Sequence, residues 1–217
     1  MPQAFRPGAN TISRVTLAGA LTAPWLLLWL GTEFNWHAFI TREAVYWDQP
    51  VPFSHQHHVG QLGIDCRYCH TGVETSAFAG LPPTRTCMTC HSQVWVDSPL
   101  LAPVRESWET GRPIPWERVN DLPDFVYFNH SIHVHKGIGC SSCHGRIDRM
   151  PLTEKPHQLF MSWCLDCHRS PDRFVRPRSE IYNMAWQPPA AQQAALGGRL
   201  VRDYRVERLQ TCYTCHR

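Results

Sequence analysis

The pentapeptide Cys-x-x-Cys-His occurs five times in this chain, and the five copies use all ten of its cysteines. It is the attachment signal for c-type haem, in which the two thiols bond to the porphyrin and the histidine binds the iron. The thiols are those of Cys66, Cys69, Cys87, Cys90, Cys140, Cys143, Cys164, Cys167, Cys212 and Cys215. The proximal iron ligands are then His70, His91, His144, His168 and His216. The motifs therefore predict five covalently bound haem c groups.

Two other uses of paired cysteines explain the pattern less well. A disulfide framework has no need of a histidine after every second cysteine. Zinc sites would join the motifs in pairs as four-ligand centres, and five motifs leave one without a partner.

Five haems would form much of the interior of a 217-residue chain. We therefore expect mostly loops and short α-helices wrapped around the haems, with little β-structure. The 18 prolines and 13 glycines fit a loop-rich chain. The formal net charge of +3 is modest, and we expect no nucleic-acid partner.

An apolar segment near the N-terminus predicts a membrane anchor. Residues 15–32 carry no charge, and about 20 apolar residues span a bilayer. We expect an anchor over residues 1–40, with its transmembrane helix at about 14–32, and an extracytoplasmic haem domain over 41–217. Arg14 precedes the apolar segment and Glu33 follows it, which places the haem domain outside the cytoplasm.

A cleaved signal peptide is the alternative. The A-x-A pattern that cleavage would need lies at residues 18–20, before the leucine-rich run rather than after it. Trp25, Trp29 and Trp36 gather toward the outer end, as interfacial tryptophans do. These features favour a retained, single-pass anchor in the inner membrane, with the haem domain on the periplasmic side.

The sequence contains an internal repeat. FSHQHHVGQLGIDC at 53–66 resembles FNHSIHVHKGIGC at 128–140, with one residue of difference in length. Each copy is followed by two haem motifs, so we expect two-haem modules at 53–91 and 128–168. The fifth haem belongs to residues 190–217, where a helix predicted over 190–206 precedes the last motif. An ordered linker at 98–124 joins the modules, with Trp108 and Trp116 as expected packing anchors.

The repeat supplies candidate distal iron ligands. In each His-x-x-His unit, the first histidine can fold over its own haem and the second can reach a neighbouring haem. The four candidates are His55, His58, His130 and His133. Five haems need a fifth, and the spare candidates are His37, His57, His135, His157, Met150, Met161 and Met184. We expect a methionine, Met161 or Met150, with His157 or an open iron as alternatives.

Other chemistries lack their signatures. The chain has no phosphate-binding glycine loop, no dinucleotide fingerprint and no nucleophilic triad pattern. None of the five motifs carries lysine in place of histidine, so the likeness to pentahaem nitrite reductases fails at the catalytic haem. We expect no catalytic site in this chain, because the cofactors carry the chemistry.

Beyond the motifs, the chain resembles the pentahaem cytochrome c component of bacterial alternative complex III. The segments that carry the resemblance are the two FxHxxHV modules, WERVNDLPDFVYFNHSIH, MSWCLDCHR and LVRDYRVERLQTCYTCHR. It also resembles class III multihaem cytochromes more broadly.

The resemblance implies a role within a membrane complex that oxidises menaquinol. Electrons would come from an iron–sulfur subunit, then pass to a monohaem cytochrome c subunit or a soluble carrier. Membrane lipid and an integral membrane quinol-binding subunit would be the other partners. The alternative is a stand-alone, membrane-anchored multihaem quinol dehydrogenase that feeds a periplasmic reductase.

Overall fold

The computed structural model describes residues 5–33 and 41–216. Trp36 and His37, which the sequence suggested for the membrane exit and as a spare iron ligand, lie outside this range. The chain divides into two units, Met1–Glu43 and Ala44–Arg217. They are called the anchor unit and the haem unit below.

The anchor unit contains one long helix, α1 (Ala9–Glu33), with Pro24 inside it and no buried residue. Within the described residues it is the one helix long and apolar enough to cross a membrane. It includes the whole of the expected span and begins earlier, since polar Asn10 and Ser13 continue the helix toward its start. A signal sequence meets the same criteria, so retention of the anchor stays a prediction.

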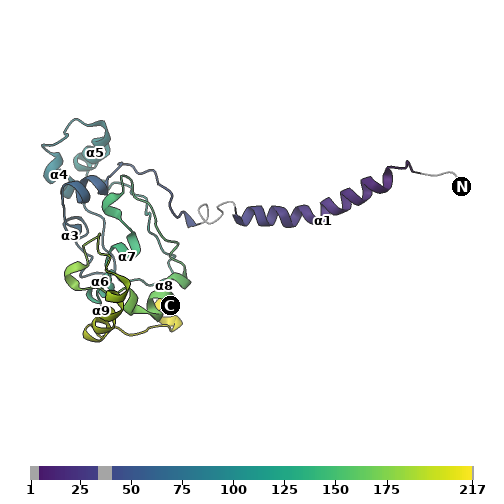
Figure 1. Cartoon of the computed structure of the whole chain (residues 1–217). Helices are drawn as coiled ribbons and strands as arrows, with labels where there is room; N and C mark the ends of the chain where they lie inside the picture. The colour runs from purple at the N-terminus through teal and green to yellow at the C-terminus, as the bar shows by residue number, and fades with distance from the viewer. Residues whose placement is uncertain (1–4, 34–40, 217) are drawn as a thin grey trace. The chain divides into compact units, whose positions relative to one another are not determined.

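The haem unit consists of short helices joined by loops (Figure 1). Its α-helices are α3 (Cys66–Cys69), α4 (Thr84–His91), α5 (Ala102–Thr110), α6 (His130–His135), α7 (Ser141–His144), α8 (Met161–Arg169), α9 (Ala190–Asp203) and α10 (Cys212–Cys215). The single turns are the π-helix η1 (Gln56–Gln61) and the 3-10 helices η2 (Pro99–Leu101), η3 (Ile147–Arg149), η4 (Pro171–Arg173) and η5 (Arg178–Glu180).

Extended pairing is confined to isolated antiparallel bridges in the described residues. They join Tyr46 to Glu154, Val126 to His216 and Ile138 to Val175. The expected fold of short helices and loops with little β-structure is confirmed. The second bridge brings the C-terminal haem motif beside the start of the second module.

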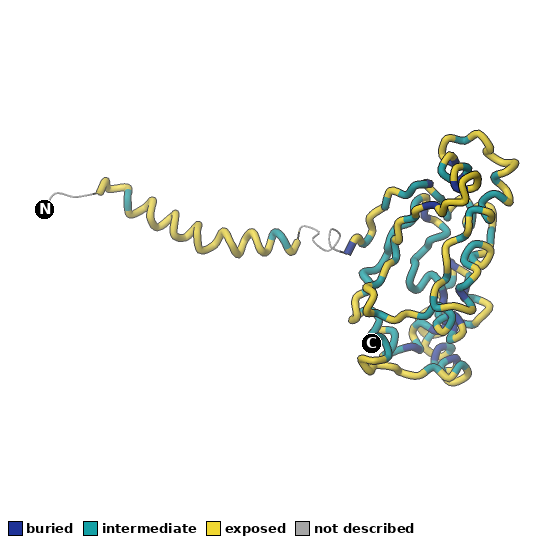
Figure 2. Tube along the Cα trace, turned by 180° about the vertical axis from the view of Figure 1, so that it is seen from behind, coloured by how far each residue is buried: buried dark blue, intermediate teal, exposed yellow. Residues whose placement is uncertain are grey.

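Buried residues occur at scattered positions along the trace of the haem unit (Figure 2), and among the described residues their side chains form small, separate clusters. One contains Val51, Leu101, Val104 and Ile114, and another contains Val73, Val134 and Ile181. A domain of this length normally buries one large core, and its apolar surface must otherwise be covered by something else. Large prosthetic groups are the expected cover.

The segment between the modules is ordered, as expected, and holds η2 and α5. Trp116 packs against the cluster that contains Val104 and Ile114. The expectation for Trp108 is wrong, because its side chain is 55% exposed. Along α5 the buried positions are Val104 and Ser107.

The equivalent backbone hydrogen bond encloses one more residue in the first copy of the repeat than in the second. After α6 the N–H of Ile138 donates to the carbonyl of His133, five residues back, whereas in the first copy the N–H of Ile64 donates to the carbonyl of His58, six residues back. The extra residue is absorbed by the π-helix η1, which holds one residue more per turn than an α-helix. The histidines before the insertion therefore keep the same local geometry in both copies.

The helix predicted over 190–206 is α9, which ends at Asp203 because Arg205 adopts a positive φ of 50°. Gly197 in α9 packs directly on the carbonyl of Asp172 in η4, where a Cβ atom would collide. This close approach fixes α9 against the segment that follows the fourth haem motif.

Candidate haem-binding sites

Every haem motif forms one helical turn, which is what the spacing requires. Cysteines three residues apart project from the same side of a helix, and the histidine at the fourth position follows on that side. In three motifs the histidine N–H donates to the carbonyl of the first cysteine, with distances of 2.9 Å for His70, His144 and His216. The two thiols and the imidazole can therefore reach one porphyrin.

The thiols do not resemble those of redox-active disulfides or zinc centres. All ten cysteines are free. Burial raises the pKa of Cys140 to about 11 and that of Cys143 to about 12, so these thiols lack the low pKa of exchange-active cysteines. Across residues 5–33 and 41–216, no three His, Cys, Asp or Glu side chains converge as ligands of one metal ion.

Three proximal histidines are held through Nδ1 by backbone carbonyls. Nδ1 lies 2.7 Å from the Gly80 oxygen in His70, 3.1 Å from Val94 in His91 and 3.2 Å from Phe125 in His216. A carbonyl only accepts, so Nδ1 carries the proton and Nε2 keeps a free lone pair. This is the tautomer that binds a metal through Nε2.

The His-x-x-His units bring their rings close to proximal histidines. The centroids of His58 and His91 lie 6.2 Å apart, and so do those of His133 and His168. The rings of His130 and His144 are 6.5 Å apart and nearly parallel. His130 thus approaches the haem motif that directly follows it in the sequence. His58 and His133 each approach the haem motif after that one.

His55 completes the pattern through electrostatic contacts. Burial, together with the nearby imidazoles of His70 and His144, lowers its pKa to about 4. Burial also lowers the pKa of His58 and His133. All three are therefore neutral near pH 7, the state that a metal-binding imidazole needs.

The ring separations fit one metal ion between two imidazoles. An imidazole nitrogen binds a metal at about 2.0 Å and lies about 1.1 Å from its ring centre, so two axial rings are separated by roughly 6.2 Å. The observed 6.2, 6.2 and 6.5 Å leave room for iron but not for direct ring stacking. The residues present therefore fit haem with two histidine ligands.

One phenylalanine organises each unit. Phe53 stacks on His58 at 4.4 Å and meets His55 edge-on at 4.9 Å. Phe128 does the same to His133 at 4.4 Å and to His130 at 4.8 Å. Sequence reasoning gave these phenylalanines no role, although both are part of the repeated Phe-x-His-x-x-His pattern.

The candidates for a fifth ligand lie in different surroundings. Met150 and Met184 are buried, whereas the side chain of Met161, in the first turn of α8, is 64% exposed. His157 stacks on Trp163 at 5.3 Å. His57 and His135 are exposed. No ring of these spare histidines approaches His216 among the described contacts, where Phe125 is its aromatic neighbour at 5.8 Å.

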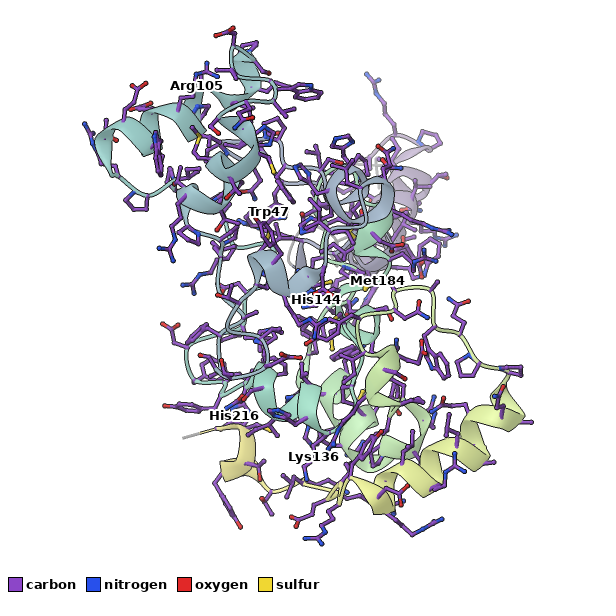
Figure 3. The ribbon with its side chains drawn as sticks, turned by 90° about the vertical axis from the view of Figure 1, so that its left-hand side faces the viewer. Trp47, Arg105, Lys136, His144, Met184 and His216 are labelled. Atoms are coloured by element: carbon purple, nitrogen blue, oxygen red, sulfur yellow. The ribbon has the colours of Figure 1, made fainter. Side chains whose placement is uncertain are left out.

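The motifs run from one end of the haem unit to the other. Arg105, on α5 beside the helix of the second motif, lies at one end, His144 near the middle and His216 at the opposite end (Figure 3). Electrostatic contacts between thiols join Cys69 to Cys87, Cys66 to Cys140, Cys143 to Cys167 and Cys164 to Cys215. The spatial order is therefore second, first, third, fourth and fifth motif.

Comparisons with known proteins cover parts of the chain. Residues 126–217, which hold three of the five motifs, match the family model described as cytochrome c7 and related cytochrome c. The chain is therefore similar to multihaem cytochromes c, a class that implies covalently bound haem c.

Over 112 residues the chain is 38% identical to the menaquinone reductase multiheme cytochrome c subunit of Nitratidesulfovibrio vulgaris. The alignment covers 51% of this chain and 52% of that protein, so the chain spans about half the length of the curated relative that it matches.

Proposed function

We propose that this chain is the pentahaem electron-transfer component of a membrane complex that oxidises menaquinol, of the alternative complex III type. Haem iron supplies reversible one-electron transfer, and the protein fixes the distances and the ligands. Electrons enter from an iron–sulfur subunit, then leave to a cytochrome c subunit or a soluble carrier. The observation that carries the proposal is the set of paired imidazoles, which closes both axial positions of iron.

Three of the axial pairs follow from the ring contacts, and the pair of His55 with His70 follows from their electrostatic contact. His55 serves the haem of His70, His58 that of His91, His130 that of His144, and His133 that of His168. Two histidine ligands leave no position for a substrate, so these haems transfer electrons only. The linear order of the motifs supports the same conclusion, because it gives a continuous path with the second and fifth haems as its ends.

For the fifth haem we assign Met161 as the distal ligand. Met161 lies one turn before Cys164 on α8, and the Cys164 thiol interacts electrostatically with Cys215 of the fifth motif. Its exposed sulfur is available, whereas the buried side chain of Met150 is not. His157 interacts with His144 and thus lies nearer the third motif. Methionine ligation would give this haem a higher potential than the other four.

Met161→Leu tests this assignment, with Met150→Leu as the matched control. Near-infrared magnetic circular dichroism of the oxidised protein should show one methionine–iron band, which Met161→Leu removes and Met150→Leu retains. A band that survives Met161→Leu, or is absent from the unmodified protein, would refute Met161 as ligand.

Membrane association is part of the proposal. Helix α1 would hold the chain in the inner membrane with the haem unit on the periplasmic side. A stand-alone quinol dehydrogenase is not favoured, because the similar protein is named as a subunit of a menaquinone reductase.

That name supports a second candidate, in which the same haems carry electrons toward menaquinone instead. Purified complex should be mixed anaerobically with a menaquinol analogue. Rapid reduction of all five haems, with fully low-spin spectra, is expected for menaquinol oxidation. Reduction of menaquinone by the prereduced haems, without the reverse reaction, would support the second candidate. A dominant high-spin haem that binds cyanide or nitrite would overturn both.

A further inference from the structure

Three of the four proposed distal histidines are held by backbone carbonyls. The Nδ1 atoms of His58, His130 and His133 lie 2.9, 2.8 and 2.7 Å from the oxygens of Ser54, Ala77 and Asn129. These acceptors are present whatever side chain stands at those positions. Side-chain substitution at Ser54, Ala77 or Asn129 would leave the acceptor oxygen in place.

His55 differs from the other three. Its Nδ1 lies 3.1 Å from the hydroxyl oxygen of Thr153, 98 residues further along the chain. If Nε2 of His55 faces iron, Nδ1 carries the proton and the Thr153 hydroxyl accepts it. The haem of the first module is thus oriented by a side chain that follows the third haem motif.

Several contacts build this position. The N–H of Gln56 donates to the carbonyl of Met150 at 3.0 Å. Gly60 packs against the backbone oxygen of Asp148, where a Cβ atom would collide. The Asp148 carboxylate is itself held by two guanidinium nitrogens of Arg146, at 2.8 and 2.6 Å. The segment that bears Thr153 is therefore fastened against η1, and Thr153 and His55 are both half-buried.

From this geometry we infer that Thr153 is a positioning residue for the haem bound at Cys66 and Cys69, acting through His55. A hydrogen bond accepted from Nδ1–H fixes the ring orientation and raises the basicity of the metal-binding nitrogen. A more basic ligand stabilises ferric iron over ferrous iron and lowers the reduction potential of this haem. The inference rests on the proposed role of His55 as its distal ligand.

The test compares Thr153→Val, which keeps the shape but removes the acceptor, with Thr153→Ser, which keeps the hydroxyl. Thr110→Val is the matched control, because the Thr110 hydroxyl donates to the carbonyl of Glu106 within α5 and accepts from the N–H of Arg112, and neither partner is a proposed haem ligand. Each full-length holoprotein would be titrated potentiometrically, with EPR used to follow the individual low-spin haems.

Thr153→Val should raise the reduction potential of one haem. The expected change is about tenfold in the equilibrium constant for its reduction, which corresponds to a shift of about 59 mV for one electron. Thr153→Ser and Thr110→Val should leave all five transitions in place. Conversion of that haem to a high-spin form in Thr153→Val, with Thr153→Ser normal, would equally support a positioning role. Unchanged potentials and spectra in Thr153→Val, or a shift that Thr153→Ser reproduces in full, would overturn the inference.

His55→Ala separates this inference from the proposed function. If His55→Ala opens one iron while Thr153→Val changes nothing, only the role of Thr153 is lost. If His55→Ala leaves every haem low-spin, the assignment of His55 as an axial ligand fails first.

Discussion

The rings of His133 and His168 lie 6.2 Å apart, and His133 is fixed on its other side by Phe128 and by the Asn129 carbonyl. This arrangement predicts the effect of removing one ligand. His133→Ala should leave one iron with an open position, giving a high-spin signal and binding of carbon monoxide. Added imidazole should restore the low-spin spectrum, because the cavity is shaped for that ring.

The matched control for this variant is His135→Ala. His135 lies on the same helix, α6, and is exposed. We expect its spectrum to equal that of the unmodified protein. A low-spin His133→Ala protein, or a high-spin His135→Ala protein, would contradict the proposed pairing.

Two neighbouring glycines in α9 should respond oppositely to alanine. Gly197→Ala places a methyl group against the Asp172 carbonyl and should destabilise the haem unit by about 1–3 kcal/mol. Gly198 has open space around its Cβ position, with the nearest atom of Arg202 4.0 Å away. Gly198→Ala should stabilise the helix by about 0.5–1 kcal/mol, because alanine loses less backbone entropy.

Chemical denaturation followed by circular dichroism measures both variants. Equal stabilities for the two proteins would show that the contact between α9 and η4 is not as close as described.

Tyr182 predicts sensitivity to alkali. Its hydroxyl donates to Glu74 at 2.8 Å, and burial, followed by this carboxylate, raises its pKa well above the usual value near 10. The folded state therefore keeps a proton that the unfolded state releases above about pH 10. The stabilisation is complete below pH 10 and is lost as the pH rises toward the folded pKa.

Tyr182→Phe should cost about 1 kcal/mol at pH 7, the usual net value of a hydrogen bond. It should also show a shallower loss of stability between about pH 9.5 and 11, in urea unfolding at each pH. Tyr213→Phe is the control, because that side chain is 78% exposed. A variant whose alkaline slope equals that of the unmodified protein would argue against the Tyr182–Glu74 bond.

Helix α1 predicts tight membrane attachment. Alkaline carbonate should fail to strip the full-length protein from membranes, because the uncharged residues 15–32 are long enough to span the bilayer. Deletion of residues 1–33 should release the haem unit after export with a cleavable leader. Immunoblots of the pellet and supernatant measure both, and release of the full-length chain by carbonate would refute the anchor.

The sequence by itself determined the cofactor chemistry of this protein. The two cysteines and the histidine of a motif lie on one helical turn, so they can reach the same porphyrin without any tertiary contact. The motifs therefore indicate haem c directly. The repeat Phe-x-His-x-x-His is equally local, and it identified His55, His58, His130 and His133 as candidates. The apolar run of α1 was also visible, because its 3.6-residue turn and length depend on nothing distant.

Tertiary structure alone decided which of these groups meet. Nothing in the residues near His58 shows that its ring approaches His91, and the order of the motifs in space differs from their order in sequence. Thr153 reaches His55 across 98 residues because Gly60 allows η1 to lie against Asp148. The prediction for Trp108 was wrong for a related reason, since burial depends on which face of α5 the rest of the chain covers. Local spacing fixes what a residue can bind, whereas long-range packing fixes what it is near.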